Sequence, residues 1–203
     1  VCESDIQNYF KIIFKFKIQL DGNKNIIIFD FDEVFSVIKK NIYAVEQKLN
    51  FTFKEVVLIL ENFNPSFVNL TGFKRLNGSQ VLKENITYIL NSLKSCVDEI
   101  ENKKKVLHIF NSNFNLDSKK IKNLPIGLFG DFYSHELSFV LINLNDYKNL
   151  TNIFEKCNLS IKKILIKSFI SGAHISDNNT NADTFFQIKM NSTNSKVIYF
   201  ENN

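Results

Sequence analysis

Arginine is almost absent from this sequence: of its 25 basic residues, a single one, Arg75, is arginine. Because the planar guanidinium group is the usual reader of guanine and the usual paired grip on phosphate, its scarcity argues against a nucleic-acid-binding protein. The three cysteines, Cys2, Cys96 and Cys157, are odd in number and far apart in the sequence. This spacing argues against a disulfide framework and a structural zinc site, and it fits a reducing cytoplasm.

Long hydrophobic runs are also missing. No apolar run reaches the roughly 18 residues that a membrane-spanning helix needs, and the N-terminus does not have the residue order of a signal peptide. We therefore expect a soluble, cytoplasmic chain. Its 44% hydrophobic content is enough for a core, and its net charge of +4 is only mildly basic. Asn, Lys and Phe are abundant and share AT-rich codons, which indicates a coding bias. Asn-x-Ser/Thr glycosylation motifs arise by chance in such an Asn-rich chain, so they predict nothing about glycosylation.

Hydrophobic periodicity predicts alternating strands and helices. Apolar residues three or four positions apart predict three amphipathic helices, at about 32–50, 81–101 and 146–157. The predicted strands are Phe10 to Leu20, Ile26 to Phe29, Val56 to Leu60, Phe67 to Leu70, Val106 to Phe110, Phe114 to Leu116, Glu136 to Ile142, Ile161 to Ile166, and a hairpin of Phe185 to Met190 with Lys196 to Phe200. We expect Val56 to Leu60 to be buried on both faces and Asp32 to cap the first helix. The class is mixed α/β, without an internal repeat.

Three consecutive segments carry the most specific pattern. They read VLHIFNSNFNLD at 106–117, IKNLPIGLFG at 121–130 and ELSFVLI at 136–142. In order and spacing they resemble FtsA, the bacterial cell-division protein of the actin superfamily. In that family a V-L-H strand, an acidic-ended strand, an N-P-x-G-x-x-G loop and a V-H-L-I-type strand follow one another. The resemblance continues through 149–159 and 164–172.

The resemblance implies a particular organisation. Part of an actin-like subdomain IA would be interrupted by subdomain IC, the strand-helix-strand-strand insertion that distinguishes FtsA from actin. The corresponding boundaries are 1–66 for part of subdomain IA, 67–165 for the insertion, and 166–203 for the return to subdomain IA. A full family member has a glycine-rich first phosphate loop before this region and a second lobe after it. The chain therefore looks like a portion of a longer protein.

The second phosphate loop of the family, of the D-x-G-G-G-T type, matches residues 188–193. By this match the candidate nucleotide-binding residues are Asn191, Ser192 and Thr193. Thr193 agrees with the family, but Ile188 replaces the acidic residue, and Met190, Asn191 and Ser192 replace the glycines. Without the carboxylate there is no evident holder for Mg²⁺, and side chains crowd the phosphates. We therefore expect no cofactor, no metal and no catalytic residue in this chain, although the family binds ATP and magnesium.

The resemblance also implies a function, that of a scaffold rather than an enzyme. FtsA polymerises on the inner face of the cell membrane through a C-terminal amphipathic helix and anchors the ring formed by the tubulin-like FtsZ. By this resemblance we expect neither that helix nor the FtsZ-binding lobe within residues 1–203. The implied partners are FtsZ, other division proteins and further copies of the chain, with no nucleic acid. Exposed strand edges of the insertion would suit such protein contacts.

Two alternatives stay open. A PilM-like pilus-assembly adaptor shares the actin-like core and a similar insertion. The segment IIIFDFDEVF at 26–35 also looks like the first motif of haloacid-dehalogenase-type phosphatases. In such an enzyme Asp30 would attack phosphorus, Asp32 would act as acid and base, and Mg²⁺ would reduce the repulsion between the carboxylates and the phosphate. The residues available for the other roles are Ser112 and Lys163 or Lys167.

Histidine and cysteine give no clear site. The three histidines, His108, His135 and His174, are too scattered to predict a metal or catalytic set, and His108 lies within an apolar strand. Cys96 and Cys157 fall on the apolar faces of predicted helices. We expect both to be core residues rather than nucleophiles.

Overall fold

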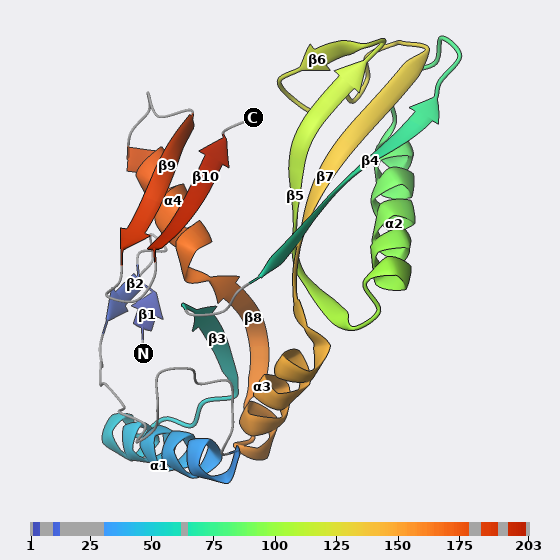
Figure 1. The fold of residues 1–203 in the computed structure, drawn as a ribbon. Coiled ribbons are helices and arrows are strands. Elements are labelled where there is room, and N and C mark those ends of the chain that lie inside the picture. The colour runs from blue at the N-terminus through green and yellow to red at the C-terminus, as the bar shows by residue number, and fades with distance from the viewer. Residues whose placement is uncertain are drawn as a thin grey trace. The chain divides into compact units, whose positions relative to one another are not determined.

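The computed structural model describes residues 2–4, 10–12, 31–61, 65–178, 184–190 and 195–201 (Figure 1). Its elements are β1 (Cys2–Ser4), β2 (Phe10–Ile12), α1 (Phe31–Leu49), β3 (Glu55–Leu60), β4 (Ser66–Arg75), α2 (Lys83–Ile100), β5 (Lys104–Leu116), β6 (Lys119–Ile121), β7 (Phe132–Asn143), α3 (Leu144–Lys156), β8 (Ser160–Ile166), α4 (Lys167–Asn178), β9 (Thr184–Met190) and β10 (Ser195–Glu201). The predicted mixed α/β class is confirmed. The chain divides into two compact units, Val1–Val57 with Asn145–Lys163, and Leu58–Leu144 with Ile164–Asn203.

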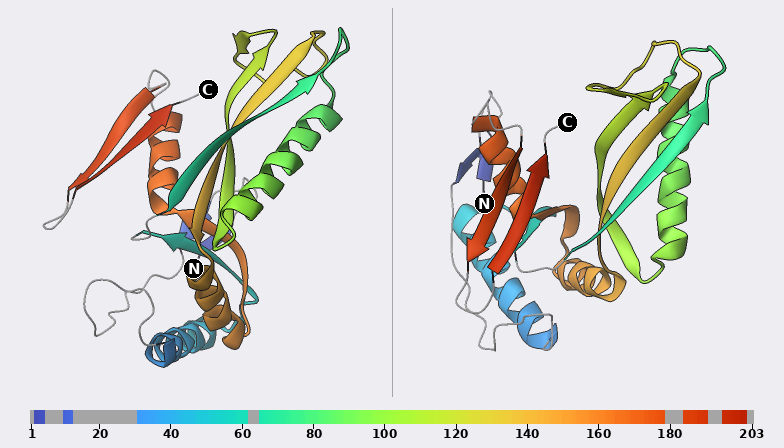
Figure 2. Two further views of the ribbon diagram at one scale, coloured as in Figure 1. Left: turned by 45° about the vertical axis from the view of Figure 1, so that its right-hand side comes forward. Right: turned by 45° about the horizontal axis from the view of Figure 1, so that its top comes forward.

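The largest sheet lies in the second unit and has the strand order β4-β7-β5-β6. All its neighbouring strands are antiparallel, and β4 pairs with β7 without interruption from Ser66 opposite Leu141 to Arg75 opposite Phe132. Helix α2 runs along one face of this sheet in all three views (Figures 1 and 2). The order β4-α2-β5-β7 is the strand-helix-strand-strand order that the FtsA resemblance implies, with the short β6 added.

The face of the sheet under α2 holds the core of this unit. Alternate residues of β7 point to it, so Tyr133, Leu137 and Phe139 are completely buried. They pack against Ile89 and Val97 of α2 in two adjoining apolar clusters. Burial of this apolar area is the main source of stability for a sheet and helix of this size.

Strand β5 corrects the prediction of two separate strands at Val106 to Phe110 and Phe114 to Leu116. It is one strand of 13 residues. Its register against β7 shifts between Val106 and His108 and again between Asn111 and Asn113, as in two β-bulges. Each bulge adds one residue and so reverses the alternation of faces. The sequence therefore loses its period of two in the middle of an otherwise continuous strand.

In the first unit, α1 begins one residue earlier than expected. Asp32 is therefore not the cap of this helix but lies in its first turn beside Glu33, where a negative charge favours the helix dipole. Lys156 at the end of α3 places its Nζ 4.6 Å from the centre of the Phe31 ring. After α1, the backbone N–H of Phe53 donates to Glu46 Oε1 at 2.9 Å.

Strand β3 corrects another expectation. Val56 to Leu60 was expected to be buried on both faces, but its residues alternate, with Val57 and Ile59 more than half exposed. This strand pairs with β8, and Lys162 of β8 forms an ion pair with Glu55 at 3.2 Å. The next strand, predicted for Phe67 to Leu70 only, continues to Arg75 as β4. Helix α4 and the short strand β6 were not predicted.

The predicted hairpin is confirmed as β9 and β10, which pair from Thr184 opposite Glu201 to Met190 opposite Ser195. One of its faces packs on α4, where the Phe200 ring lies so close to Gly172 that no side chain would fit there. The other face is exposed and consists of Phe186, Ile188, Met190, Val197 and Tyr199. The strand predicted at Ile26 to Phe29, and residues 13–20 of the first predicted strand, lie outside the described residues. No helix in the described part is long and apolar enough to cross a membrane.

Candidate protein-interaction surface

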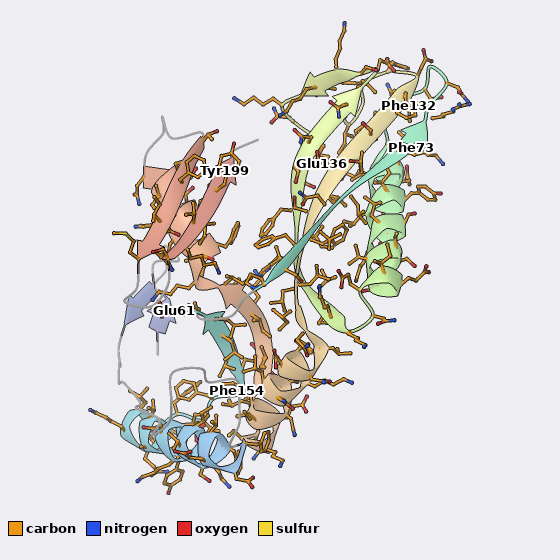
Figure 3. The ribbon with its side chains drawn as sticks, in the orientation of Figure 1. Glu61, Phe73, Phe132, Glu136, Phe154 and Tyr199 are labelled. Carbon is orange, nitrogen blue, oxygen red and sulfur yellow. The ribbon has the colours of Figure 1, made fainter. Side chains whose placement is uncertain are left out.

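The four-stranded sheet has a second face, opposite α2, which we call the open face. Its pairing registers place there the side chains of Asn69, Thr71 and Phe73 on β4, Phe132, Ser134, Glu136 and Ser138 on β7, and Asn113 and Asn115 on β5. Most of these side chains are polar, in contrast to the apolar side chains under α2. Figure 3 shows Phe73, Phe132 and Glu136 on the neighbouring strands β4 and β7.

Hydrogen bonds between strands satisfy much of the polar part of the open face. Asn113 Nδ2 donates to Glu136 Oε2 at 2.7 Å, and Asn115 Nδ2 donates to Ser134 Oγ at 3.3 Å. The hydroxyls of Ser112 and Ser138 lie 2.5 Å apart. Because these groups bind one another, the part of the open face that they occupy does not need a covering helix. Toward the end of β7, Val140 and Ile142 lie on the same face but are buried.

Aromatic rings lie at both ends of the open face. At one end Phe73 stacks on Phe132 with ring centres 5.5 Å apart, although Phe73 remains 65% exposed. At the other end His108 and Phe110 stack with each other, and Phe110 stacks on Phe169 of α4 at 4.4 Å. The exposed ring of Phe67, also on β4, is near this second end.

The two edges of the sheet differ. Strand β6 has three residues, two of which are exposed lysines, and both short length and lysine discourage pairing with another strand. Strand β4 has ten residues, no proline and an unbroken register, and among the described strands it pairs on one side only. Its charges are confined to Lys74 and Arg75 at its end. An edge of this kind presents a row of backbone donors and acceptors to a further strand.

Two polar groups lie in the core under α2. His135 is 1% exposed, and its Nε2 donates to Asn111 Oδ1 at 3.0 Å, which requires the Nε2–H tautomer. Burial lowers the pKa of His135 and raises the pKa of Tyr133 to about 12. Within the described part of the chain, the Tyr133 hydroxyl and His135 Nδ1 have no hydrogen-bond partner. Both groups are therefore held in their neutral forms.

The candidate residues from the sequence do not form one site. The three nucleotide-binding candidates, Asn191, Ser192 and Thr193, lie outside the described residues, as does Asp30, so their roles stay predictions. Ser112 is on β5 of the sheet, Lys163 is exposed on β8, and Lys167 forms an ion pair with Glu61. With Asp32 inside a helix, the described residues offer no arrangement that favours the phosphatase alternative.

The histidines and cysteines are equally dispersed. His108 and His135 lie on opposite faces of the sheet, and His174 is exposed on α4. Residues 31–61, 65–178, 184–190 and 195–201 include no group of three His, Cys, Asp or Glu side chains that could hold a metal ion. Cys157 lies in the turn after α3, half-buried, and burial raises the pKa of its thiol, which nearby Lys39 partly offsets.

Comparison with known proteins identifies two curated relatives. One is the cell division protein FtsA of Buchnera aphidicola subsp. Schizaphis graminum (strain Sg), 27% identical over 141 residues, which are 69% of this chain and 33% of that protein. The other is the cell division protein FtsA of Buchnera aphidicola subsp. Baizongia pistaciae (strain Bp), 26% identical over 162 residues, 79% of this chain and 37% of that protein. Both relatives are FtsA proteins. The resemblance predicted from the motifs is thus confirmed, and the chain is FtsA-like but divergent.

This similarity supports an actin-like domain. No protein-family model matches the chain. The chain spans about a third of the length of the curated relatives that it matches. The domain boundaries 1–66, 67–165 and 166–203 stay predictions.

Sequence reasoning missed the full extent of β4. The segment Ser66 to Arg75 alternates strictly between the two faces along all ten residues, and its burial follows that pattern. Thr71 and Gly72 interrupt the apolar signal, so the strand was predicted to end at Leu70. Gly72 has a packing reason to be small, because a Cβ there would meet Ile89 Cγ2 of α2 at 2.5 Å. No apolar period of two runs through the whole segment, because Val68 and Leu70 face α2 whereas Phe73 lies on the open face. The sequence therefore offers no signal for the full length of this edge strand.

Proposed function

We propose that this chain is part of an FtsA-like cell-division scaffold and binds a protein partner along β4. The observation that carries the proposal is the ten-residue edge of β4, which lacks the usual protections against pairing. A partner strand added at this edge would gain backbone hydrogen bonds along β4. Alternate side chains on the open face, above all Phe67 and Phe73, would add specificity.

The open face suits a scaffold better than an enzyme. Its polar side chains are bound to one another, as in the pair Asn113 and Glu136, rather than converging on a cavity. Such a surface can hold a partner with few structural changes in either protein. The similarity to two FtsA proteins favours division over the pilus-assembly or phosphatase alternatives, since neither alternative has a matching observation.

The finer parts of the function rest on the family resemblance. For the whole protein we propose assembly of the division complex, attachment of the FtsZ ring, self-association, and a cytoplasmic location on the inner face of the membrane. The full-length family binds ATP, but we propose no cofactor for this chain. The glycines of the family's second phosphate loop are replaced here. Residues 66–143 would contribute the partner-binding edge.

The test is cell imaging of the wild type and of two double variants, each of which introduces two lysines. A fluorescent fusion of the complete gene product should gather at the division site. The double variant Asn69→Lys/Thr71→Lys places two charges on exposed positions of the edge strand and should reduce the septal signal several-fold. The control Thr87→Lys/Asn91→Lys places the same charges on exposed positions of α2 and should leave the signal unchanged.

Two results would contradict the proposal. An even distribution of the wild-type fusion through the cytoplasm would argue against a division role. Septal signals that fall equally in the edge variant and the α2 control would argue against β4 as the contact. Thermal melting of both purified variants is needed alongside, because a loss of folding in either would also remove the signal.

A further inference from the structure

Five large apolar side chains are exposed together at one end of the four-stranded sheet, and we call them the tip patch. They are Leu82, Leu124, Ile126, Leu128 and Phe129, with exposed fractions between 40 and 67%. They lie in the loops before α2 and before β7, at the end of the sheet where β4 ends and β7 begins (Figures 1 and 2). Exposed apolar residues that cluster in this way mark a surface that binds something.

The loops of the tip patch are held by their backbones. Val81 N–H donates to the Leu128 carbonyl, and Gly127 N–H donates to the Val81 carbonyl, both at 2.9 Å. Val81 is fully buried, and Gly78 N–H donates to the Gly130 carbonyl at 3.1 Å. The apolar side chains are therefore exposed from an ordered structure in which the backbone groups are already paired, not from a loop that could fold them inward.

The turn at Gly127 fixes which residues point outward. Gly127 has a φ of +86°, a conformation that side chains disfavour, and nothing lies within 4 Å of the place where its Cβ would be. The turn brings Pro125 inward, where it is buried, while Ile126 and Leu128 on either side of the glycine stay exposed. Phe129, opposite Gln80, continues the exposed row.

Basic side chains surround the tip patch. Segments 74–84 and 117–131 carry six basic residues against three acidic ones, whereas the whole chain has a net charge of only +4. Of the basic residues, Arg75, Lys83, Lys119, Lys120 and Lys122 are exposed. Among the acidic ones, Asp117 uses its Oδ1 to accept hydrogen bonds from the backbone N–H groups of Asp131 and Phe132, both at 2.8 Å. The charge offered to the surroundings is therefore positive.

We propose that the tip patch docks on an anionic lipid surface. Protruding apolar side chains would enter the boundary between headgroups and acyl chains, and the surrounding lysines would bind the anionic headgroups. Such a surface takes a patch of this kind without a matching groove, because lipid adapts to the shape of the inserted residues. This inference rests on the tip patch alone and does not depend on the partner-binding role of β4.

Co-sedimentation with vesicles tests the proposal. The protein should bind vesicles containing phosphatidylglycerol, bind pure phosphatidylcholine vesicles much more weakly, and lose affinity as salt is raised. Ile126→Ser/Phe129→Ser should weaken binding to the anionic vesicles about tenfold or more. The matched control Ile188→Ser/Phe186→Ser removes the same two residue types from the exposed face of the hairpin and should leave the affinity unchanged.

A second pair of variants separates charge from apolar contact. Lys119→Gln/Lys120→Gln should weaken anionic binding about tenfold, whereas Lys40→Gln/Lys94→Gln, on exposed helical positions, should change it little. Equal binding to both vesicle types, or unchanged binding by the Ile126 and Phe129 variant, would overturn the proposal. So would a dimer in sedimentation velocity that this variant dissociates without any change in vesicle binding, since the patch would then be a protein contact.

Discussion

The four-stranded sheet and the β9–β10 hairpin both have one packed face, but their second faces differ in chemistry. On the sheet the second face is mostly polar, with Asn113 bound to Glu136 and Asn115 bound to Ser134. On the hairpin it is apolar and exposed, and includes Phe186, Ile188 and Val197. In Figure 3 Glu136 marks the first kind of face and Tyr199 the second.

This difference distinguishes a complete unit from an incomplete one. The polar side chains of the open face form hydrogen bonds across the strands and can also be hydrated. Exposure of this part of the face to water therefore costs little free energy. The exposed face of the hairpin is apolar instead, and apolar side chains stabilise a protein only when they are buried against something. Two strands alone are also marginally stable. The sheet with α2 should therefore be self-sufficient, and the hairpin should depend on further contacts.

Excision should break the comparison most sharply. A fragment of residues 66–143, which contains β4, α2, β5, β6 and β7, should fold alone, give dispersed amide signals by NMR and melt in one step. A fragment of residues 167–201, with α4 and the hairpin, should give the narrow amide range of an unfolded chain. A folded hairpin fragment beside an unfolded sheet fragment would show that the assignment of complete and incomplete units is reversed.

Single truncations should show a smaller effect in the same direction. Leu137→Ala removes a side chain that is 0% exposed and should cost about 2 to 5 kcal/mol of unfolding free energy. Ile188→Ala on the hairpin, 62% exposed, should cost less than about 0.5 kcal/mol. Urea denaturation of both variants gives the two values. Comparable losses would mean that the exposed hairpin face is packed in solution.

The pH dependence of stability should give the smallest effect, and it should report on the packed face of the sheet. Burial lowers the pKa of His135 below its ordinary 6.5, so the unfolded chain binds the proton more tightly. Stability should therefore be complete above about pH 6.5 and fall as the pH drops further. His135→Gln should flatten this acid-side slope relative to the wild type in denaturation series from pH 5 to 8.

Tyr133 should act at the opposite end of the pH range. Its pKa is raised to about 12 from 10, so the unfolded chain loses the proton first. Stability is then complete below about pH 10 and is lost as the pH rises toward 12. In Tyr133→Phe that loss should be smaller than in the wild type. If stability depended on pH in His135→Gln and in Tyr133→Phe as it does in the wild type, the titrating groups responsible would lie outside this core.

The helices were the most predictable part of the fold because their signal is local. In α2 the residues Ile86, Ile89, Leu93 and Val97 recur at spacings of three or four, and all contribute to the core. Helix α4 was missed because Gly172 and its neighbouring serines weaken the helical signal, and the reason for the glycine is the distant Phe200 ring. The packing partner that explains it is 28 positions away in the sequence.

The candidate surface was less predictable than the fold. The bulges of β5 hide its continuity, since the residues that face α2 there are spaced by three and then two positions instead of always two. The position of β4 at the edge of the sheet follows from its pairing with β7, which comes more than fifty residues later in the sequence. No local sequence pattern predicts which strand lies at an edge.

The pairing of β4 with β7 also has a consequence for how such a chain is put together. Ser66, where β4 starts, lies opposite Leu141, close to where β7 ends, so the polypeptide leaves this module beside the point at which it came in. A module with adjacent ends can be added to a host loop at little cost beyond the entropy of closing that loop. The same geometry would let a short turn replace residues 67–140 and reconnect the chain. Transplantation of the module into a loop of an unrelated protein should therefore leave that host's fold intact.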